Sequence, residues 1–320
     1  MKVVTFLNLK GGVGKTTSVH NIASALTRMN SPRRTRVLVI DLDHQANYTV
    51  SMGVALPNMR IERLDMANPR AQWEKEQEGG EEAEPITSIG SLLLDEAAHM
   101  FQGELPVGHF LNEWGESERL DLGAPDIIRN VSADYDFIPA DPDMVLFDQA
   151  FEALGRYGDP RRLQVLRNLL HRVEQLPAEG RRKTRYDIVL IDTNPSLNYL
   201  TQNALMASSH ILVPVAAEYY PALGLAQLVP RLGQAIAAGA PIQSTRALIT
   251  MTRKTRMSVT AEQTIRSWCG NQVFQRTVPH ATRVQTAVAA RMRSVVTDAP
   301  NSEAAQAYIE VADWYAKQAG

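Results

Sequence analysis

The chain has 320 residues, of which 44% are hydrophobic and 21% are charged, and its formal net charge is −2 at pH 7. A chain of this length and apolar content can bury a sizeable core, which excludes a small scaffold held together by disulfides or metal. The single cysteine, Cys269, excludes an intrachain disulfide or a cysteine-rich cluster, and no apolar run approaches the roughly 18 residues of a membrane span, so we expect a cytoplasmic protein.

The N-terminal residues predict a strand, a glycine-rich loop and a helix. "KVVTFLN" is a short apolar run rich in β-branched residues, and "TTSVHNIASALTRM" carries apolar side chains at helical spacing. The loop between them matches the phosphate-binding pattern G-x-x-x-x-G-K-[ST], except that Leu9 replaces the first glycine and Lys10 adds a second lysine.

This loop predicts a site for a nucleoside triphosphate. Its glycines let successive backbone N–H groups and the start of the next helix face an anion. Lys15 can then reach the terminal phosphates, and the Thr16 hydroxyl can ligate Mg²⁺. The nucleotide-binding residues expected from the loop pattern are Gly11, Gly12, Val13, Gly14, Lys15, Thr16 and Thr17.

Two later apolar runs end in carboxylates: "RVLVIDLD" at Asp41 and Asp43, and "YDIVLIDTNPS" at Asp192. Further apolar runs at 210–216, 246–251 and 272–279 alternate with helical stretches near 222–237, 258–268 and 302–318. Unbroken apolar strands followed by helices predict an α/β fold with a doubly wound, mostly parallel sheet covered by helices on both faces. Because ligands of such sheets bind at the carboxyl ends of the strands, we expect the aspartates beside the loop.

Charge is distributed unevenly along the chain. We expect an acidic, partly mobile insertion at about 57–130, centred on "WEKEQEGGEEAEP". Residues 228–293 hold one acid, Glu262, and ten basic residues: Arg231, Arg246, Arg253, Lys254, Arg256, Arg266, Arg276, Arg283, Arg291 and Arg293. So one-sided a segment favours a polyanion partner, and the alternative is a charged surface that serves solubility.

Five stretches carry a resemblance to a known family: "KGGVGKTT", "DLDHQANYT", "VLIDTNPSL", "VPVAAEYYPALGLAQL" and "LITM". In these stretches the chain resembles the ParA family of deviant Walker-type P-loop ATPases, to which MinD-type proteins are related. The resemblance implies a single ATPase domain over 1–320, interrupted by the acidic insertion, with ATP and Mg²⁺ as cofactors. It implies that Lys10 crosses to the partner's phosphates in an ATP-bound homodimer, so that Lys10, Lys15 and Asp43 are catalytic, with Asp43 orienting the attacking water. Asp41 and Asp192 would hold the Mg²⁺ shell through water, although Asp41 could instead cap backbone amides at the end of its strand.

The resemblance also suggests which residues approach the adenine base, and it shows two departures from the family pattern. The loop "VPHAT" stands where relatives approach adenine, which makes Pro279 a candidate, with Thr250 and Met251 as alternatives. His44 and Asn194 stand where the family usually has proline, and we interpret His44 as a loop substitution rather than a ligand.

The leading functional hypothesis is an ATPase that segregates a plasmid, chromosome or other cargo over the nucleoid. Its dimer would bind DNA non-specifically through residues at and before "TRKTRMS", and a ParB-like or other adaptor would stimulate slow hydrolysis. The expected DNA-binding residues are Arg231, Arg253, Lys254 and Arg256. The first alternative is a MinD-like membrane regulator, but the C-terminal "EAAQAYIEVADWYAKQAG" offers one cation, Lys317, and favours a packed helix over membrane contact. The second is a metabolic P-loop enzyme, which would not explain the arginines.

Overall fold

The computed structural model describes residues 1–28, 35–54, 88–101, 129–130, 135–141, 144–155, 160–175, 186–218, 221–281 and 293–318. Most of the expected acidic insertion at 57–130 lies outside these residues, as do Arg283 and Arg291.

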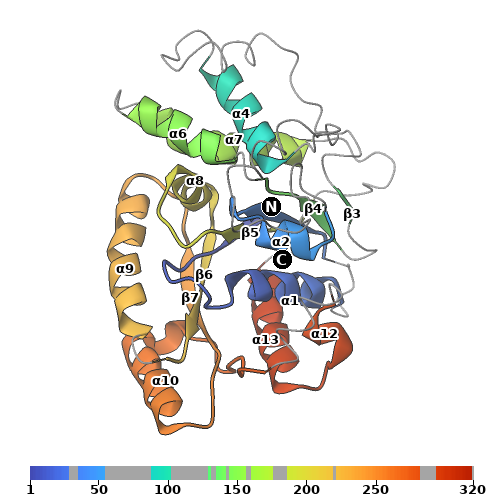
Figure 1. The fold of residues 1–320 in the computed structure, drawn as a ribbon, viewed down its shortest axis with the longest axis vertical. Coiled ribbons are helices and arrows are strands. Elements are labelled where there is room, and N and C mark those ends of the chain that lie inside the picture. Colours follow the sequence, from blue (N-terminus) through green and yellow to red (C-terminus); the bar gives the residue numbers. More distant parts are fainter. Residues whose placement is uncertain are drawn as a thin grey trace, which may run out of the picture.

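The described strands form one sheet with the order β3-β4-β2-β5-β1-β6-β7 (Figure 1). The strands are β1 (Lys2–Phe6), β2 (Val37–Leu42), β3 (Arg129–Asn130), β4 (Asp136–Ile138), β5 (Ile188–Thr193), β6 (His210–Ala216) and β7 (Ser244–Thr250). Neighbouring strands are parallel except for β3, which is antiparallel to β4. The predicted doubly wound, mostly parallel sheet is confirmed.

Helices cover both faces of this sheet. The helices are α1 (Lys15–Arg28), α2 (Asn47–Ser51), α4 (Ile89–Met100), α6 (Met144–Gly155), α7 (Val165–Gln175), α8 (Tyr199–Ala207), α9 (Pro221–Ala237), α10 (Arg256–Cys269), α12 (Val295–Asp298) and α13 (Glu303–Gln318). Short 3₁₀ turns lie at η1 (Pro160–Leu163) and η2 (Gly270–Gln272). None of the helices in the described ranges is long and apolar enough to cross a membrane.

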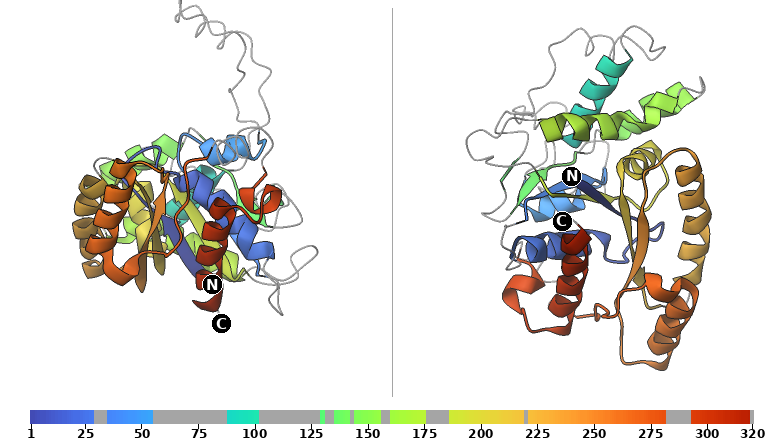
Figure 2. Two further views of the ribbon diagram at one scale, coloured as in Figure 1. Left: turned by 90° about the horizontal axis from the view of Figure 1, so that it is seen from below. Right: turned by 180° about the vertical axis from the view of Figure 1, so that it is seen from behind.

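The two faces carry separate apolar cores because successive strand residues point to opposite sides. In β5, Val189 and Ile191 pack with α4, α6, α7 and α8, whereas Ile188 and Leu190 pack with α1, α12 and α13. A third cluster joins β6 and β7 to α9 and α10, which lie side by side in Figure 2. The middle of each central strand is therefore an unbroken apolar run, as the sequence pattern predicts.

Three elements refine the expectations from sequence. Within the segment 57–130, α4 is a buried helix of the core. The helix α13 packs against α1 with Tyr308 and Tyr315 fully buried, as expected. The apolar run at 272–279 makes only isolated bridges to the chain at Ala247 and Thr252. It does not continue the sheet because the N–H groups of Gln275 and Arg276 turn to the Glu310 carboxylate, each at 2.9 Å.

Candidate nucleotide-binding site

The register of the central strands brings the predicted residues together. Phe6 at the end of β1 pairs with Asp192 of β5, and Asp192 in turn pairs with Asp41 of β2. Since these strands are parallel, the loops that follow them leave the same edge of the sheet. The glycine-rich loop, Asp43 and Asn194 therefore lie at one edge.

The loop between β1 and α1 has the backbone shape that its glycines predict. Gly12 and Gly14 adopt φ values of 71° and 86°, in the left-handed region that favours glycine. A Cβ built at Gly11, Gly12 or Gly14 would meet no atom within 4 Å, so the space beside each of these glycines is open. The Gly14 carbonyl accepts from Ser18 N at 2.9 Å, which places the first turn of α1 directly behind the opening.

The two lysines of the loop have different surroundings. Lys15 is 7% exposed, and its ammonium donates to the carbonyl oxygens of Asn8 at 3.1 Å and of Lys10 at 3.5 Å. Burial lowers the pKa of Lys15, and the carboxylates of Asp192 and Asp43 oppose that shift. Lys10 is exposed, and its Nζ lies 2.6 Å from Glu218 Oε2, just beyond β6.

Asp192 is fully buried without a hydrogen-bond partner for either carboxylate oxygen in the described part of the chain. Burial, and next the Asp41 carboxylate, hold the pKa of Asp192 well above its usual value, while the Thr16 hydroxyl and the Lys15 ammonium offset part of that effect. Buried polar groups almost always have partners. A cation or ordered water would fit as the missing partner of these two oxygens.

Asp41 is also fully buried, but its oxygens are already occupied. They accept from Asp43 N at 3.2 Å, Thr49 N at 2.9 Å and Thr49 Oγ1 at 2.7 Å. Burial raises the pKa of Asp41 to about 7 against these hydrogen bonds. Asp41 thus caps backbone amides, as the alternative interpretation expected.

The oxygen donors Thr16, Asp41 and Asp192 fit Mg²⁺, which prefers oxygen ligands and keeps several waters. Among the described residues no group of three or more His, Cys, Asp or Glu side chains is arranged to hold a metal by itself. An ion held largely by phosphate oxygens and water would satisfy both observations.

Asp43 lies in a tight turn at the end of β2 and is 7% exposed. Its Oδ1 accepts from Gln45 N at 3.0 Å, and its carbonyl accepts from Ala46 N at 2.7 Å, with Ala46 at φ 49°. The carboxylate is therefore held by its own turn, close enough to Lys15 to act on its charge.

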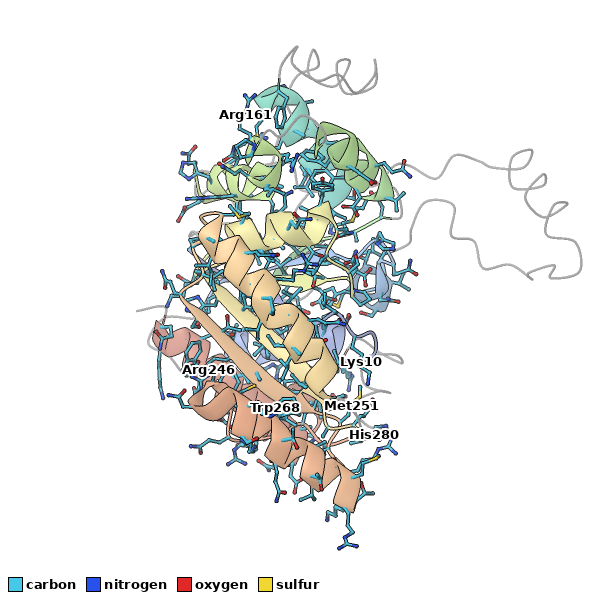
Figure 3. The ribbon with its side chains drawn as sticks, turned by 90° about the vertical axis from the view of Figure 1, so that its left-hand side faces the viewer. Lys10, Arg161, Arg246, Met251, Trp268 and His280 are labelled. Atoms are coloured by element: carbon cyan, nitrogen blue, oxygen red, sulfur yellow. The ribbon has the colours of Figure 1, made fainter. Side chains whose placement is uncertain are left out.

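The candidates for base recognition lie next to the loop. Thr250 Oγ1 donates to the Val13 carbonyl at 2.9 Å, which ties the end of β7 to the glycine-rich loop. Met251 follows with φ 55°, and Thr252 bridges to Pro279. Figure 3 shows Lys10, Met251 and His280 along one edge of the molecule.

The structure separates the basic residues into two groups. The guanidinium carbon of Arg246 lies 4.9 Å from the Phe274 ring centroid and 5.0 Å from that of Trp314, and Arg266 donates to Glu262 and to two backbone carbonyls. Arg293 lies 3.8 Å from Asp298.

The other group is exposed and forms no side-chain ion pair with an acid in the described ranges: Arg231, Arg253, Lys254, Arg256 and Arg276. Arg231 lies on α9, where it contacts Gln234 at 3.2 Å. Arg253, Lys254 and Arg256 surround the start of α10, where the Thr255 hydroxyl accepts from Ser258 N.

Sequence reasoning missed three residues that shape the site. Asn8 supplies the carbonyl for Lys15, Glu218 pairs with Lys10, and Thr49 links Asp41 to the Ala140 amide at 2.8 Å. No local pattern marks these residues. All three lie inside the stretches "KVVTFLN", "VPVAAEYYPALGLAQL" and "DLDHQANYT", but their partners are set by the fold.

The comparisons with known proteins agree with this geometry. The AAA domain family matches residues 1–97 and 109–241. The chain is 29% identical over 312 residues to the chromosome-partitioning ATPase Soj of Thermus thermophilus, covering 97% of this chain and 93% of that protein.

Two solved structures share the fold. A putative plasmid partition protein from Borrelia burgdorferi bound to AMPPNP has a TM-score of 0.64 and 20% identity, covering 99% of each chain. Cobyrinic acid a,c-diamide synthase from Mycobacterium smegmatis with ADP and magnesium has a TM-score of 0.64 and 21% identity, covering 99% of this chain and 95% of that one.

The sheet order, the glycine-rich loop and the carboxylates at the strand ends define a P-loop NTPase fold with a deviant Walker A loop. Within that class, the chain belongs to the ParA family of the ParA/MinD superfamily.

Proposed function

We propose that the chain is a partition ATPase whose ATP-bound dimer binds DNA non-specifically and whose hydrolysis releases it. The cycle would segregate a plasmid, chromosome or other cargo, with slow turnover stimulated by a ParB-like or other adaptor. Partition proteins among the similar chains support the biological role. We place the protein in the cytoplasm, on the nucleoid.

Nucleotide binding would use the open concave side of the glycine-rich loop. The backbone N–H groups of Gly11 to Thr16 and the start of α1 would face phosphate oxygens, and Lys15 would exchange its two carbonyl contacts for the terminal phosphates. Mg²⁺, when bound, neutralises charge on those oxygens. Thr16 would hold the ion directly, and Asp41 and Asp192 would hold it through water.

Hydrolysis would be completed by the second chain. Lys10 points outward, with 49% of its side chain exposed, so it can reach a nucleotide across a dimer interface. There it would stabilise charge that develops on the transferred phosphoryl group, while Asp43 orients the attacking water.

The observation that carries the DNA-binding proposal is the link between β7 and the nucleotide loop. Thr250 donates to Val13 of the loop, and the exposed cations begin three residues later at Arg253. Because this basic surface begins beside the nucleotide site, a dimer that forms around ATP can present two such surfaces to DNA. Combined binding by both chains would then make DNA affinity depend on ATP.

The rival functions have less support. A membrane-anchoring C-terminal helix would need an apolar face outside the core, but Tyr308 and Tyr315 of α13 are buried against α1. The likeness to the cobyrinic acid enzyme, at 21% identity, concerns the fold alone.

DNA retention tests the proposal. The purified chain should co-sediment with unrelated duplexes of equal length in the presence of ATP and Mg²⁺, and much less with ADP or without nucleotide. Lys15→Ala, which lacks the phosphate-binding ammonium, should show no ATP effect. Equal retention in all three nucleotide conditions would contradict the proposal, and so would none in any of them.

A further inference from the structure

His44 and Asn194 connect the loops that follow β2 and β5. The last residues of these strands, Leu42 and Thr193, are paired in register, and each loop then leaves the same edge of the sheet. Asn194 Nδ2 lies 3.2 Å from His44 Nδ1. In the described part of the chain, no other hydrogen bond joins residues 43–46 to residues 194–198.

The surrounding donors decide the orientation of the Asn194 amide. Its Oδ1 accepts from Ser196 N at 3.1 Å, Ser196 Oγ at 2.8 Å and Thr201 Oγ1 at 3.2 Å. A backbone N–H can only donate, so the oxygen must face this cluster and the NH₂ must face His44. An amide NH₂ is a donor only, so His44 Nδ1 accepts. This arrangement requires the imidazole tautomer that carries its proton on Nε2.

The two side chains lie beside two carboxylates with different tasks. Asp43 directly precedes His44, and the turn that holds its carboxylate runs through His44 to the amide of Gln45. Asp192 lies two residues before Asn194, whose side chain is fully buried and anchored to the first turns of the next segment. Fixing His44 against Asn194 therefore fixes the Asp43 turn against the strand that carries Asp192.

We propose that His44 and Asn194 are positioning residues for ATP hydrolysis, which hold the water-orienting carboxylate of Asp43 at a constant place relative to Asp192. The inference rests on the proposed ATPase function. Neither side chain belongs to the loop that grips the phosphates, so the pair acts on the catalytic step and leaves nucleotide affinity to the glycine-rich loop. A displacement of a water-orienting group by about 1 Å can cost about a hundredfold in rate.

Steady-state hydrolysis by the full chain, with and without each side chain, tests the pair. His44→Leu keeps the bulk without the acceptor, and Asn194→Ala removes the donor. Each should lower kcat about tenfold or more, with KM and the calorimetric Kd for a non-hydrolysable ATP analogue within about twofold. His44→Asn places an acceptor oxygen where Nδ1 stood and should recover most of the rate. His171→Leu, at an exposed position of α7, is the matched control.

The double variant His44→Leu with Asn194→Ala separates a coupled pair from two independent effects. Residues that act through one hydrogen bond should lose no more together than either loses alone. Losses that multiply would overturn the inference, and so would an unchanged kcat in His44→Leu. If the wild-type chain hydrolyses no ATP, the proposed function and this inference both fail, whereas an active wild type with unaffected variants refutes the pair alone.

A second readout needs no turnover and tolerates a slow enzyme. Imidazole ¹⁵N chemical shifts of His44 in the folded chain at pH 8 should show the tautomer protonated at Nε2, with Nδ1 accepting a hydrogen bond. Asn194→Ala should move the Nδ1 resonance and leave that of His171 in place. A His44 ring protonated at Nδ1 would overturn the inference, because that nitrogen could not accept from Asn194.

Discussion

Lys10 and Glu218 form an ion pair across the mouth of the glycine-rich loop, with Nζ and Oε2 2.6 Å apart and the two side chains 49% and 51% exposed. An exposed pair of this kind contributes only about 0–1 kcal/mol, because water screens both charges. Within a single chain, the ion pair with Glu218 therefore holds Lys10 only weakly. A phosphate group of a second nucleotide could replace Glu218 as the partner at little cost.

Lys10→Ala should bind ATP as a monomer and lose the ATP-dependent dimer, because the missing ammonium is the group that would cross to the partner's phosphates. Light scattering with a non-hydrolysable analogue measures the dimer. Glu218→Gln is the control, since it removes the ion pair and keeps Lys10, and it should still dimerise. Normal dimerisation of Lys10→Ala would contradict the proposed contact of Lys10 with the partner's nucleotide.

Lys15→Ala should abolish measurable nucleotide binding while the fold is retained, because Lys15 is the buried ammonium beside the open loop. Isothermal titration with ATP and Mg²⁺ measures the affinity, and circular dichroism checks the fold. Lys317→Ala, at an exposed position of α13, should bind like the wild type. An unchanged affinity in Lys15→Ala would remove the loop from the proposed site.

Asp43→Ala should bind ATP and dimerise but turn over at least about a hundredfold more slowly than the wild type, because the attacking water loses its orienting carboxylate. Phosphate release under saturating ATP measures the rate. Asp43→Asn is the closer comparison, since its side chain can still accept from the Gln45 amide and preserve the turn. Hydrolysis at the wild-type rate in both variants would assign the role to another residue.

Arg256→Glu should weaken binding to unrelated duplexes alike and spare the ATP-dependent dimer, because contacts to the DNA backbone carry no sequence information. Each lost phosphate contact should reduce the slope of log affinity against log salt by about 0.9, and a symmetric dimer loses two. Arg167→Glu makes the same charge change on an exposed position of α7 and should leave the slope unchanged. Equal slopes for Arg256→Glu and Arg167→Glu would contradict the assignment of Arg256 to a DNA-binding surface.

The contribution of His20 to the free energy of unfolding should fall as the pH is lowered from 6.5 towards 4. His20 is 4% exposed, with its Nδ1 3.1 Å from the Tyr135 hydroxyl, and burial lowers its pKa from 6.5 to about 4. In that pH range the unfolded chain binds a proton that the folded chain excludes, so protonation favours unfolding. At 1.36 kcal/mol per pKa unit, His20 alone should remove about 2 kcal/mol of the free energy of unfolding by pH 5.

Urea unfolding of the wild type and of His20→Gln at pH 7.5, 6 and 5 measures this effect. Other titrating groups, including the buried Asp41 and Asp192, are common to both proteins and cancel in the difference between them. The wild type should therefore lose about 2 kcal/mol more than His20→Gln between pH 7.5 and pH 5. Parallel pH profiles for the two proteins would show that His20 does not titrate in this way.

The sequence by itself determined the glycine-rich loop, the parallel sheet and the place of the aspartates. Each depends on short-range rules: glycine at positive φ, β-branched residues in buried strands, and carboxylates that follow a strand end. Such patterns extend over fewer than about ten residues, so they can be recognised in the sequence without knowing which elements pack against them.

Only the tertiary structure decided which partners these residues have. In the sequence Arg246 and Arg253 are equivalent members of one basic segment, yet the fold places the Arg246 guanidinium against the rings of Phe274 and Trp314 and leaves Arg253 exposed to water. His44 and Asn194 are 150 residues apart and read as two separate departures from a family pattern, but the pairing of β2 with β5 joins them. Contacts of this kind depend on strand register and helix packing, which are set by the whole core and by no local pattern of residues.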